Sequence, residues 1–146
     1  MIRVEQILKE KGSQVWTVPP DATVFDALKL MAEKGVGALI VTKKDEIVGM
    51  ISERDYARKI ILQGKGSKDT LVREIMSAQV YGIRLDTTTE ECMTIMTEKR
   101  LRHLPVCEDG KLVGIVSIGD IVKSIIAQQK ITIDHLENYI MGRYMG

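Results

Sequence analysis

Two short stretches decide the fold of this chain of 146 residues: Gly49-Met50-Ile51-Ser52-Glu53-Arg54-Asp55 and Gly114-Ile115-Val116-Ser117-Ile118-Gly119-Asp120. Both have the pattern Gly-x-x-Ser-x-x-Asp, and they lie 65 positions apart. The same offset aligns residues 14–61 with residues 79–126 without a gap, and 15 of the 48 aligned positions are identical. Chance would give about three identities, at about one match in 16 positions for ordinary residue usage. The chain therefore contains two copies of one unit.

Each copy predicts the same order of elements, β-α-β-β-α. In the first copy these are strand 14–18, helix 24–34, strands 38–42 and 47–52, and helix 53–62. In the second copy they are strand 79–83, helix 89–100, strands 103–107 and 111–117, and helix 118–128. Strands covered by helices in this order predict an α/β (α+β) fold of two pseudo-symmetric repeats. Because a unit of this size buries little apolar surface alone, we expect the two copies to stack and share a core.

The repeat also predicts the domain boundaries. We assign residues 2–64 to a first domain with an N-terminal helix at 2–11, and residues 79–128 to a second domain. Residues 65–78 are predicted as a loop and short helix between the copies, and residues 129–146 as a tail with a separate helix. The apolar stripe of that tail helix needs a partner surface on this chain or on a second subunit; it consists of Ile133, Leu136, Ile140 and Met141.

The overall composition excludes several classes of protein. A net charge of +1 gives no broad electrostatic reason to expect nucleic acid or an anionic membrane as a partner. No apolar run approaches the ~20 residues that span a bilayer, and the first residues do not have the pattern of a signal peptide. Cys92 and Cys107 have neither CxxC spacing nor a disulfide framework. We therefore predict a cytoplasmic protein.

No constellation of residues predicts an enzyme. His103 and His135 fall on different predicted elements and have no metal-ligand spacing around them. The sequence contains no nucleophile elbow, Walker loop or GxGxxG motif. We expect no catalytic residues, no metal site and no catalytic cofactor.

The repeated motif allows two interpretations. Ser followed three residues later by an acid is a capping box, which would hold a helix N-terminus and do nothing more. The same helix N-terminus, however, suits a phosphate, and a carboxylate one turn away can accept both hydroxyls of a ribose. Spacing alone leaves both open. The basic residues near these helix starts favour binding; they are Arg54, Arg58, Arg100, Arg102 and His103.

The two copies differ beside this motif. Gly37-Ala38 in the first copy replaces Arg102-His103 in the second, and Arg54 replaces Gly119. These two differences in residue type beside the same motif predict two pockets, one in each copy, that are suited to different ends of a ligand.

The doubled Gly-x-x-Ser-x-x-Asp and the string Arg-His-Leu-Pro-Val at 102–106 resemble a tandem pair of cystathionine-β-synthase (CBS) domains, a Bateman module, as in stand-alone bacterial CBS-pair proteins. The resemblance covers residues 2–128 and implies two clefts between the copies for adenosyl ligands such as AMP, ADP, ATP, NAD or S-adenosylmethionine. It implies that Asp55 and Asp120 hold ribose hydroxyls and that Ser52 and Ser117 approach ribose or phosphate. The remaining nucleotide-binding residues would be Trp16, Gly37, Ala38, Glu53, Arg54, Arg58, Tyr81, Arg102, His103, Ile118 and Gly119.

The resulting hypothesis is a non-catalytic regulatory or energy-sensing protein that binds an adenine nucleotide and passes the signal to an effector protein. The alternative is a dimerisation or interaction module with vestigial clefts. Nucleic-acid binding through Lys65, Lys68, Arg54 and Arg58 is a weaker rival. The resemblance also implies a homodimer through apolar rows on helices 24–34 and 89–100, formed by Leu28, Met31 and Ala32 and by Met93, Met96 and Thr97. We expect the final helix to add Leu136, Ile140 and Met141 to this interface. The alternative is that the two rows fill the core of the chain itself.

Overall fold

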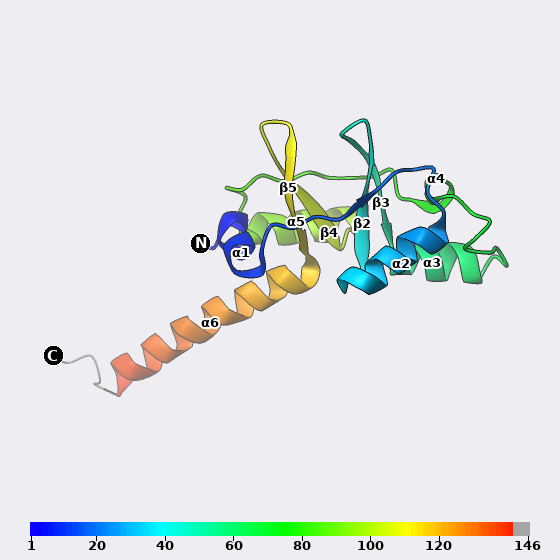
Figure 1. Cartoon of the computed structure of the whole chain (residues 1–146). Coiled ribbons are helices and arrows are strands. Elements are labelled where there is room, and N and C mark those ends of the chain that lie inside the picture. Colours follow the sequence, from blue (N-terminus) through cyan, green and yellow to red (C-terminus); the bar gives the residue numbers. More distant parts are fainter. Residues whose placement is uncertain (142–146) are drawn as a thin grey trace. The chain divides into compact units, whose positions relative to one another are not determined.

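The computed structural model describes residues 1–141, which form two compact units (Figure 1). The first-copy unit is Gln14–Gly82, and the second-copy unit joins Met1–Ser13 to the chain from Ile83 onward. The sequence-based division had placed residues 2–11 in the first domain instead. Backbone hydrogen bonds explain the difference, because the amides of Val4 and Glu5 donate to the carbonyls of Thr87 and Leu85 at 2.8 and 2.9 Å.

The first-copy unit is built around a three-stranded sheet in the order β1-β2-β3. Strand β1 is parallel to β2, and β2 is antiparallel to β3. The elements of the unit are β1 (Thr17–Val18), α2 (Val24–Lys34), β2 (Ala38–Lys43), β3 (Glu46–Ser52), α3 (Glu53–Tyr56), the π-helical turn η1 (Ala57–Ile61) and α4 (Val72–Ile75). The predicted helix 53–62 is therefore an α-helical turn followed by a π-helical one, and the predicted strand 14–18 shortens to its last two residues.

The second-copy unit has an antiparallel pair of strands, β4 and β5. Its elements are α1 (Val4–Lys11), α5 (Thr89–Lys99), β4 (His103–Glu108), β5 (Lys111–Ser117) and α6 (Ile118–Ile140). The prediction of a strand over 79–83 is wrong, because only Ile83 pairs, as an isolated parallel bridge to Val106. The next two amides do not continue the ladder, since they donate to the Thr87 hydroxyl and to the Glu108 carboxylate.

The two hairpins have the same register. Val41 lies opposite Gly49 in the first-copy unit, and Val106 lies opposite Gly114 in the second, with a bulge directly after each valine. The two-residue loops are also alike, because both central residues have positive φ, as the right-handed twist of a tight hairpin favours. The three-dimensional structure thus confirms the repeat found in the sequence.

The structure also shows a repeated element outside the aligned range. Gly114 approaches α1 so closely that a Cβ atom there would lie 2.7 Å from Leu8 Cδ1, and a Cβ on Gly49 would lie 2.7 Å from Met76 Sδ. Helix α1 therefore packs on β5 as the α4 segment packs on β3. Val4-x-x-Ile7-Leu8 and Val72-x-x-Ile75-Met76 match at an offset of 68 residues, which a gap-free alignment at 65 cannot show.

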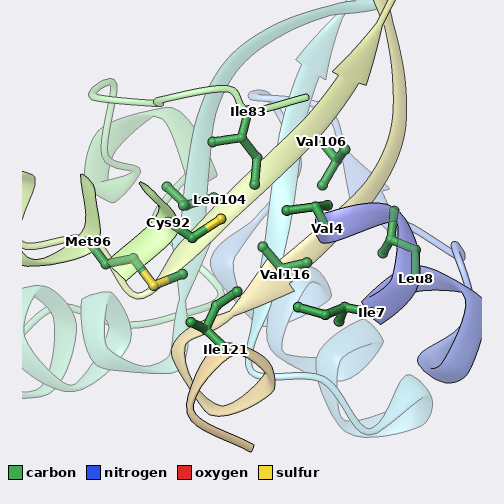
Figure 2. Packing of buried hydrophobic residues seen from close by; sticks show 10 residues of the cluster. All are labelled: Val4, Ile7, Leu8, Ile83, Cys92, Met96, Leu104, Val106, Val116 and Ile121. Atoms are coloured by element: carbon green, nitrogen blue, oxygen red, sulfur yellow. The ribbon is translucent and has the colours of Figure 1, made fainter. Parts of the chain in front are cut away.

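Each unit has its own cluster of buried apolar side chains. Figure 2 shows the cluster of the second-copy unit, which consists of Val4, Ile7, Leu8, Ile83, Cys92, Met96, Leu104, Val106, Val116 and Ile121. The cluster of the first-copy unit includes Met31. Met31 and Met96 are 1% and 3% exposed, so the prediction that they belong to exposed rows for dimerisation is wrong. The stacking of the two copies stays a prediction.

Helix α6 corrects the predicted tail. A helix at 118–128 and a separate one at 133–141 were expected, but the structure has one continuous helix of 23 residues. No glycine or proline lies between Asp120 and Ile140 to interrupt it. The predicted tail residues 142–146 lie outside the described residues. Within residues 1–141, no helix is long and apolar enough to cross a membrane.

Candidate functional site

The repeated motif forms the predicted capping box in both units. The Ser52 hydroxyl accepts from the Asp55 amide at 3.3 Å, and the Asp55 carboxylate accepts from the Ser52 amide at 3.0 Å. Ser117 and Asp120 make the same pair of bonds at 3.1 and 2.8 Å. The serines are therefore the N-caps of α3 and α6, and the structural interpretation of the motif is confirmed.

The hairpins bring the other predicted site residues to these helix starts. Ala38 is the partner of Ser52 across the β2–β3 pair, and His103 is the partner of Ser117 across β4–β5. The first amide of α3 donates to the Gly37 carbonyl at 3.0 Å, and the first amide of α6 donates to the Arg102 carbonyl at 2.8 Å. In each unit the dipeptide before the strand and the capping box thus form one local site.

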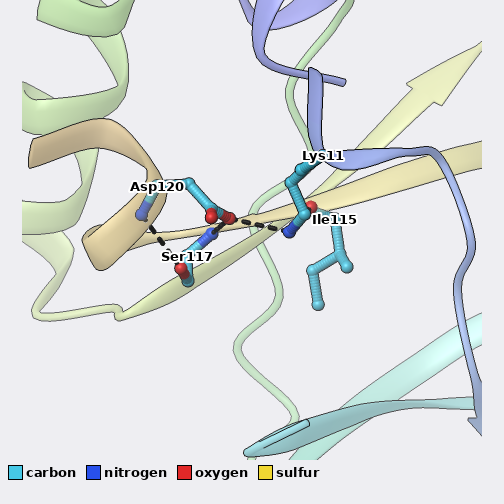
Figure 3. A network of polar contacts seen from close by, with 4 residues as sticks. All are labelled: Lys11, Ile115, Ser117 and Asp120. Carbon is cyan, nitrogen blue, oxygen red and sulfur yellow. Dashed lines mark hydrogen bonds and ion pairs between the residues drawn. The ribbon is translucent and has the colours of Figure 1, made fainter. Parts of the chain in front are cut away.

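In the second-copy unit, Lys11 from α1 reaches this site (Figure 3). Its ammonium group donates to Asp120 Oδ2 at 2.7 Å and to the Ile115 carbonyl at 3.0 Å. The Ser117 amide bonds the same oxygen, Oδ2, so Asp120 Oδ1 takes part in none of these bonds. A carboxylate offers about four lone pairs, so the remaining oxygen can accept hydroxyl groups of a ligand.

The first-copy unit has a related lysine with a different origin. Lys59 lies one turn after Asp55 on the same helical segment, and its ammonium nitrogen is 3.4 Å from Asp55 Oδ1. It also donates to the Ile75 carbonyl of α4 at 2.9 Å. In both units a lysine therefore connects the capping carboxylate to a backbone carbonyl.

The charges of the second site are set by this arrangement. Burial alone would raise the pKa of Asp120, but the bonds from Lys11 and Ser117 outweigh it and hold that pKa below its usual value. Burial lowers the pKa of His103, and the positive charges of Lys11 and Arg102 lower it further against the opposing effect of Asp120. At neutral pH the site therefore presents an ionised carboxylate beside a neutral imidazole.

The remaining predicted residues differ in their surroundings. Their side chains or backbones are exposed to solvent: Glu53, Arg54, Arg58, Arg102, Ile118 and Gly119. Trp16 is half-buried against the core of the first-copy unit, and the Lys34 ammonium lies 4.3 Å from its ring centroid. Tyr81 belongs to the first-copy unit rather than to the unit of Asp120, and its side chain is 45% exposed.

A groove of about 440 Å³ lies between α1 and α6 within the second-copy unit. Lys11 and Asp120 are part of its lining, together with Lys123. Ile7 and Ala127 contribute apolar wall. The lining also includes the carboxylate of Glu10, so two lysines and two acids face this groove. A volume of this size is typical of small-molecule sites.

Sequence reasoning missed the two lysines. Lys11 is 109 residues from Asp120 in the chain, and only the packing of α1 on the second copy brings it there. The signal that could have found it is the match of residues 4–8 with 72–76, which identifies α1 as a repeated element. Among the described residues, no group of three or more His, Cys, Asp or Glu side chains could hold a metal ion.

Comparison with known proteins now assigns the family. The model of the CBS domain matches the chain twice, over residues 4–62 and 72–127. The chain belongs to the CBS-domain family. It is 39% identical over 151 aligned residues to the CBS domain-containing protein CBSX3, mitochondrial, of Arabidopsis thaliana, and the match covers 97% of this chain and 73% of that protein.

Two solved structures of the family are similar to this one. A protein with CBS domains from Burkholderia ambifaria is 55% identical, with a TM-score of 0.83 over 87% of this chain and 96% of that one. A hexameric CBS-CP12 protein from bloom-forming cyanobacteria is 26% identical, with a TM-score of 0.77 over 100% of this chain and 91% of that one. The α/β fold of two CBS repeats is therefore confirmed.

Proposed function

We propose that this CBS pair is a regulatory protein that binds an adenine nucleotide (AMP, ADP, ATP or NAD) and has no catalysis of its own. The observation that carries the proposal is the site at the start of α6. There an ionised Asp120 is held with one carboxylate oxygen outside the capping bonds, beside Lys11, the exposed Arg102 and a groove of ligand size.

Each part of this site has a role in the proposed complex. Asp120 Oδ1 accepts the ribose hydroxyls, as acidic residues do in other nucleotide-binding folds. Lys11 and Arg102 neutralise the phosphates, and the N-terminus of α6 adds its partial positive charge. The first-copy site has glycine and alanine where the second has Arg102 and His103, so it binds the nucleotide more weakly.

Three further proposals complete this function. An effector protein responds to the nucleotide-bound state, and nucleic acid is not a partner. The protein works in the cytoplasm, where free thiols such as those of Cys92 and Cys107 stay reduced. It acts as a homodimer; the hexameric CBS-CP12 protein shows that a member of this family can self-associate.

A thermal-shift series tests the ligand class. We expect AMP, ATP or NAD at 100 times its Kd to add about 2.7 kcal/mol of stability, which corresponds to about 5–11 °C in Tm for a chain of this length. GMP and IMP at the same concentration are the controls and should give smaller shifts. If no adenosyl compound shifts the Tm, the helix starts are caps alone and the chain is an interaction module.

Calorimetric titration of three variants then tests the site. Asp120→Asn keeps an oxygen acceptor for the cap but removes the charge, so we expect roughly a ten-fold or larger loss of affinity, since hydrogen bonds to charged groups contribute ~1.5–3 kcal/mol. Asp55→Asn should lose less. Thr23→Ala removes the N-cap of α2 in the first-copy unit, on an element that carries no residue of either proposed site, and should leave the affinity unchanged. Equal affinity in all three variants would contradict the role of Asp120.

A further inference from the structure

Helix α6 carries an exposed apolar stripe with the spacing of a coiled coil. Its members recur at alternating intervals of four and three residues: Val122, Ile126, Gln129, Ile133, Leu136 and Ile140. Isoleucine occupies each of the a positions (126, 133 and 140), and leucine or valine occupies two of the three d positions. In parallel coiled coils, isoleucine at a with leucine at d favours two strands over three or four.

The side chains of the second-copy unit do not cover this stripe. The inward face of α6 is a different one, on which Ile121 is fully buried and Ile125 packs against the core of the unit. Ile133, Leu136 and Ile140 are 54%, 57% and 79% exposed. Between Gln129 and Ile140 only Asn138 is not classed as exposed, and Figure 1 shows this half of the helix running past the other elements of its unit.

An uncovered helical extension of this kind needs a partner. Most helical stability in proteins comes from the packing of an amphipathic face, and short helices are marginal in water without it. A strict a/d stripe is narrow, which fits the seam between two helices better than the broad apolar face of a helix lying on a membrane. The exposed charges of this part of α6, Lys130, Asp134 and Glu137, are also mixed in sign, whereas membrane-surface helices are rich in lysine and arginine.

We propose that two copies of this chain associate through α6 in a parallel, two-stranded coiled coil. In that arrangement the polar Gln129 faces the same residue of the second copy, and the two amides can bond each other. An antiparallel pair would instead place Gln129 against an aliphatic side chain. A polar residue at one core position sets register and orientation at some cost in stability. This proposal specifies the surface of the homodimer and does not depend on nucleotide binding.

Sedimentation equilibrium of matched variants tests the surface. The native protein should sediment at twice the chain mass of 16.4 kDa. The double variant Ile133→Glu/Leu136→Glu should dissociate at least ten-fold more readily, because it places charges in the seam. Ile131→Glu is the control, since its side chain is equally exposed (57%) but lies outside the stripe. An unchanged dimer in the double variant, or a native monomer, would overturn the proposal.

Two further measurements keep the result interpretable. Far-UV circular dichroism and the Tm of the double variant show whether it is folded, and a folded monomer supports the proposal. Leu136→Cys tests the orientation, because only a parallel pair brings the two cysteines together under mild oxidation. Asp134→Cys, which lies outside the a and d positions, is the control. Equal cross-linking of both variants would exclude the parallel coiled coil.

Discussion

The two capping boxes differ in the lysine that serves them. Lys59 belongs to the same helical segment as Asp55 and lies 3.4 Å from it, whereas Lys11 comes from α1 and lies 2.7 Å from Asp120. The first pair is local and forms wherever the helix forms. The second pair exists only because α1 packs on the second copy. One sequence motif therefore carries an ion pair within one helical segment in the first unit and an ion pair between distant segments in the second.

The largest expected difference between the units lies at the glycine of each motif. An added Cβ at Gly49 would lie 2.8 Å from the Ser77 carbonyl, whose residue exchanges two backbone bonds with Met50 and cannot move easily. At Gly114 the nearest atoms belong to the side chain of Leu8, which can shift. Overpacking costs ~1–3 kcal/mol, so we expect about 3 kcal/mol for Gly49→Ala and about 1 kcal/mol for Gly114→Ala in urea unfolding.

The control for these variants is Gly37→Ala, because nothing lies within 4 Å of an added Cβ there and its φ is not positive. It should unfold at nearly the native urea concentration. Equal losses at Gly49 and Gly114 would show that α1 and α4 hold their strands with the same rigidity.

A smaller difference is expected between the two lysines. Lys11→Met removes a charge-assisted hydrogen bond from a carboxylate that is 24% exposed, and we expect a loss of about 1 kcal/mol after allowing for solvent screening of a bond worth ~1.5–3 kcal/mol. Lys59→Met should cost only about 0.3 kcal/mol, since that lysine is 41% exposed and its carboxylate pair is longer.

Acid unfolding of the same variants gives an independent measurement. Because the folded-state pKa of Asp120 is lowered, its stabilisation is present above the ordinary aspartate pKa of ~3.9 and is lost as the pH falls through the folded value. Lys11→Met should therefore reduce the loss of stability below about pH 4. If the stability of Lys11→Met falls with acid as steeply as that of the native protein, then Lys11 does not lower the pKa of Asp120.

Local spacing made much of this structure predictable from the sequence. Helix α2 matches its predicted range of 24–34, because Thr23 caps it and Gly35 ends it in the left-handed conformation. The Ser–Asp caps were also predicted, since their bonds span three residues within one turn. These features depend only on neighbours in the chain.

Features that depend on distant packing were not predictable in this way. The segment 79–83 carries the strand pattern, but the amides after Ile83 find side-chain acceptors instead of a strand. Lys11 joins the site of Asp120 only through the placement of α1. Five residues separate Leu8 from the first copy at Gln14, but only two separate Met76 from the second copy at Gln79, and this difference of three hides the similarity of α1 to α4. The ligand and the residues that bind it stay predictions.

The smallest expected effect concerns His103, whose place in the first copy is taken by Ala38. Burial lowers the pKa of His103, with Lys11 and Arg102 acting in the same direction. The unfolded chain then binds a proton near pH 6.5 while the folded chain does not, so the free energy of unfolding falls as the pH drops below about 6.5.

His103→Gln removes this group, and we expect it to flatten the dependence of stability on pH between 7 and 5. Parallel slopes for the native protein and His103→Gln would show that His103 is protonated equally in both states, and the charge difference between the two sites would then rest on Lys11 and Arg102.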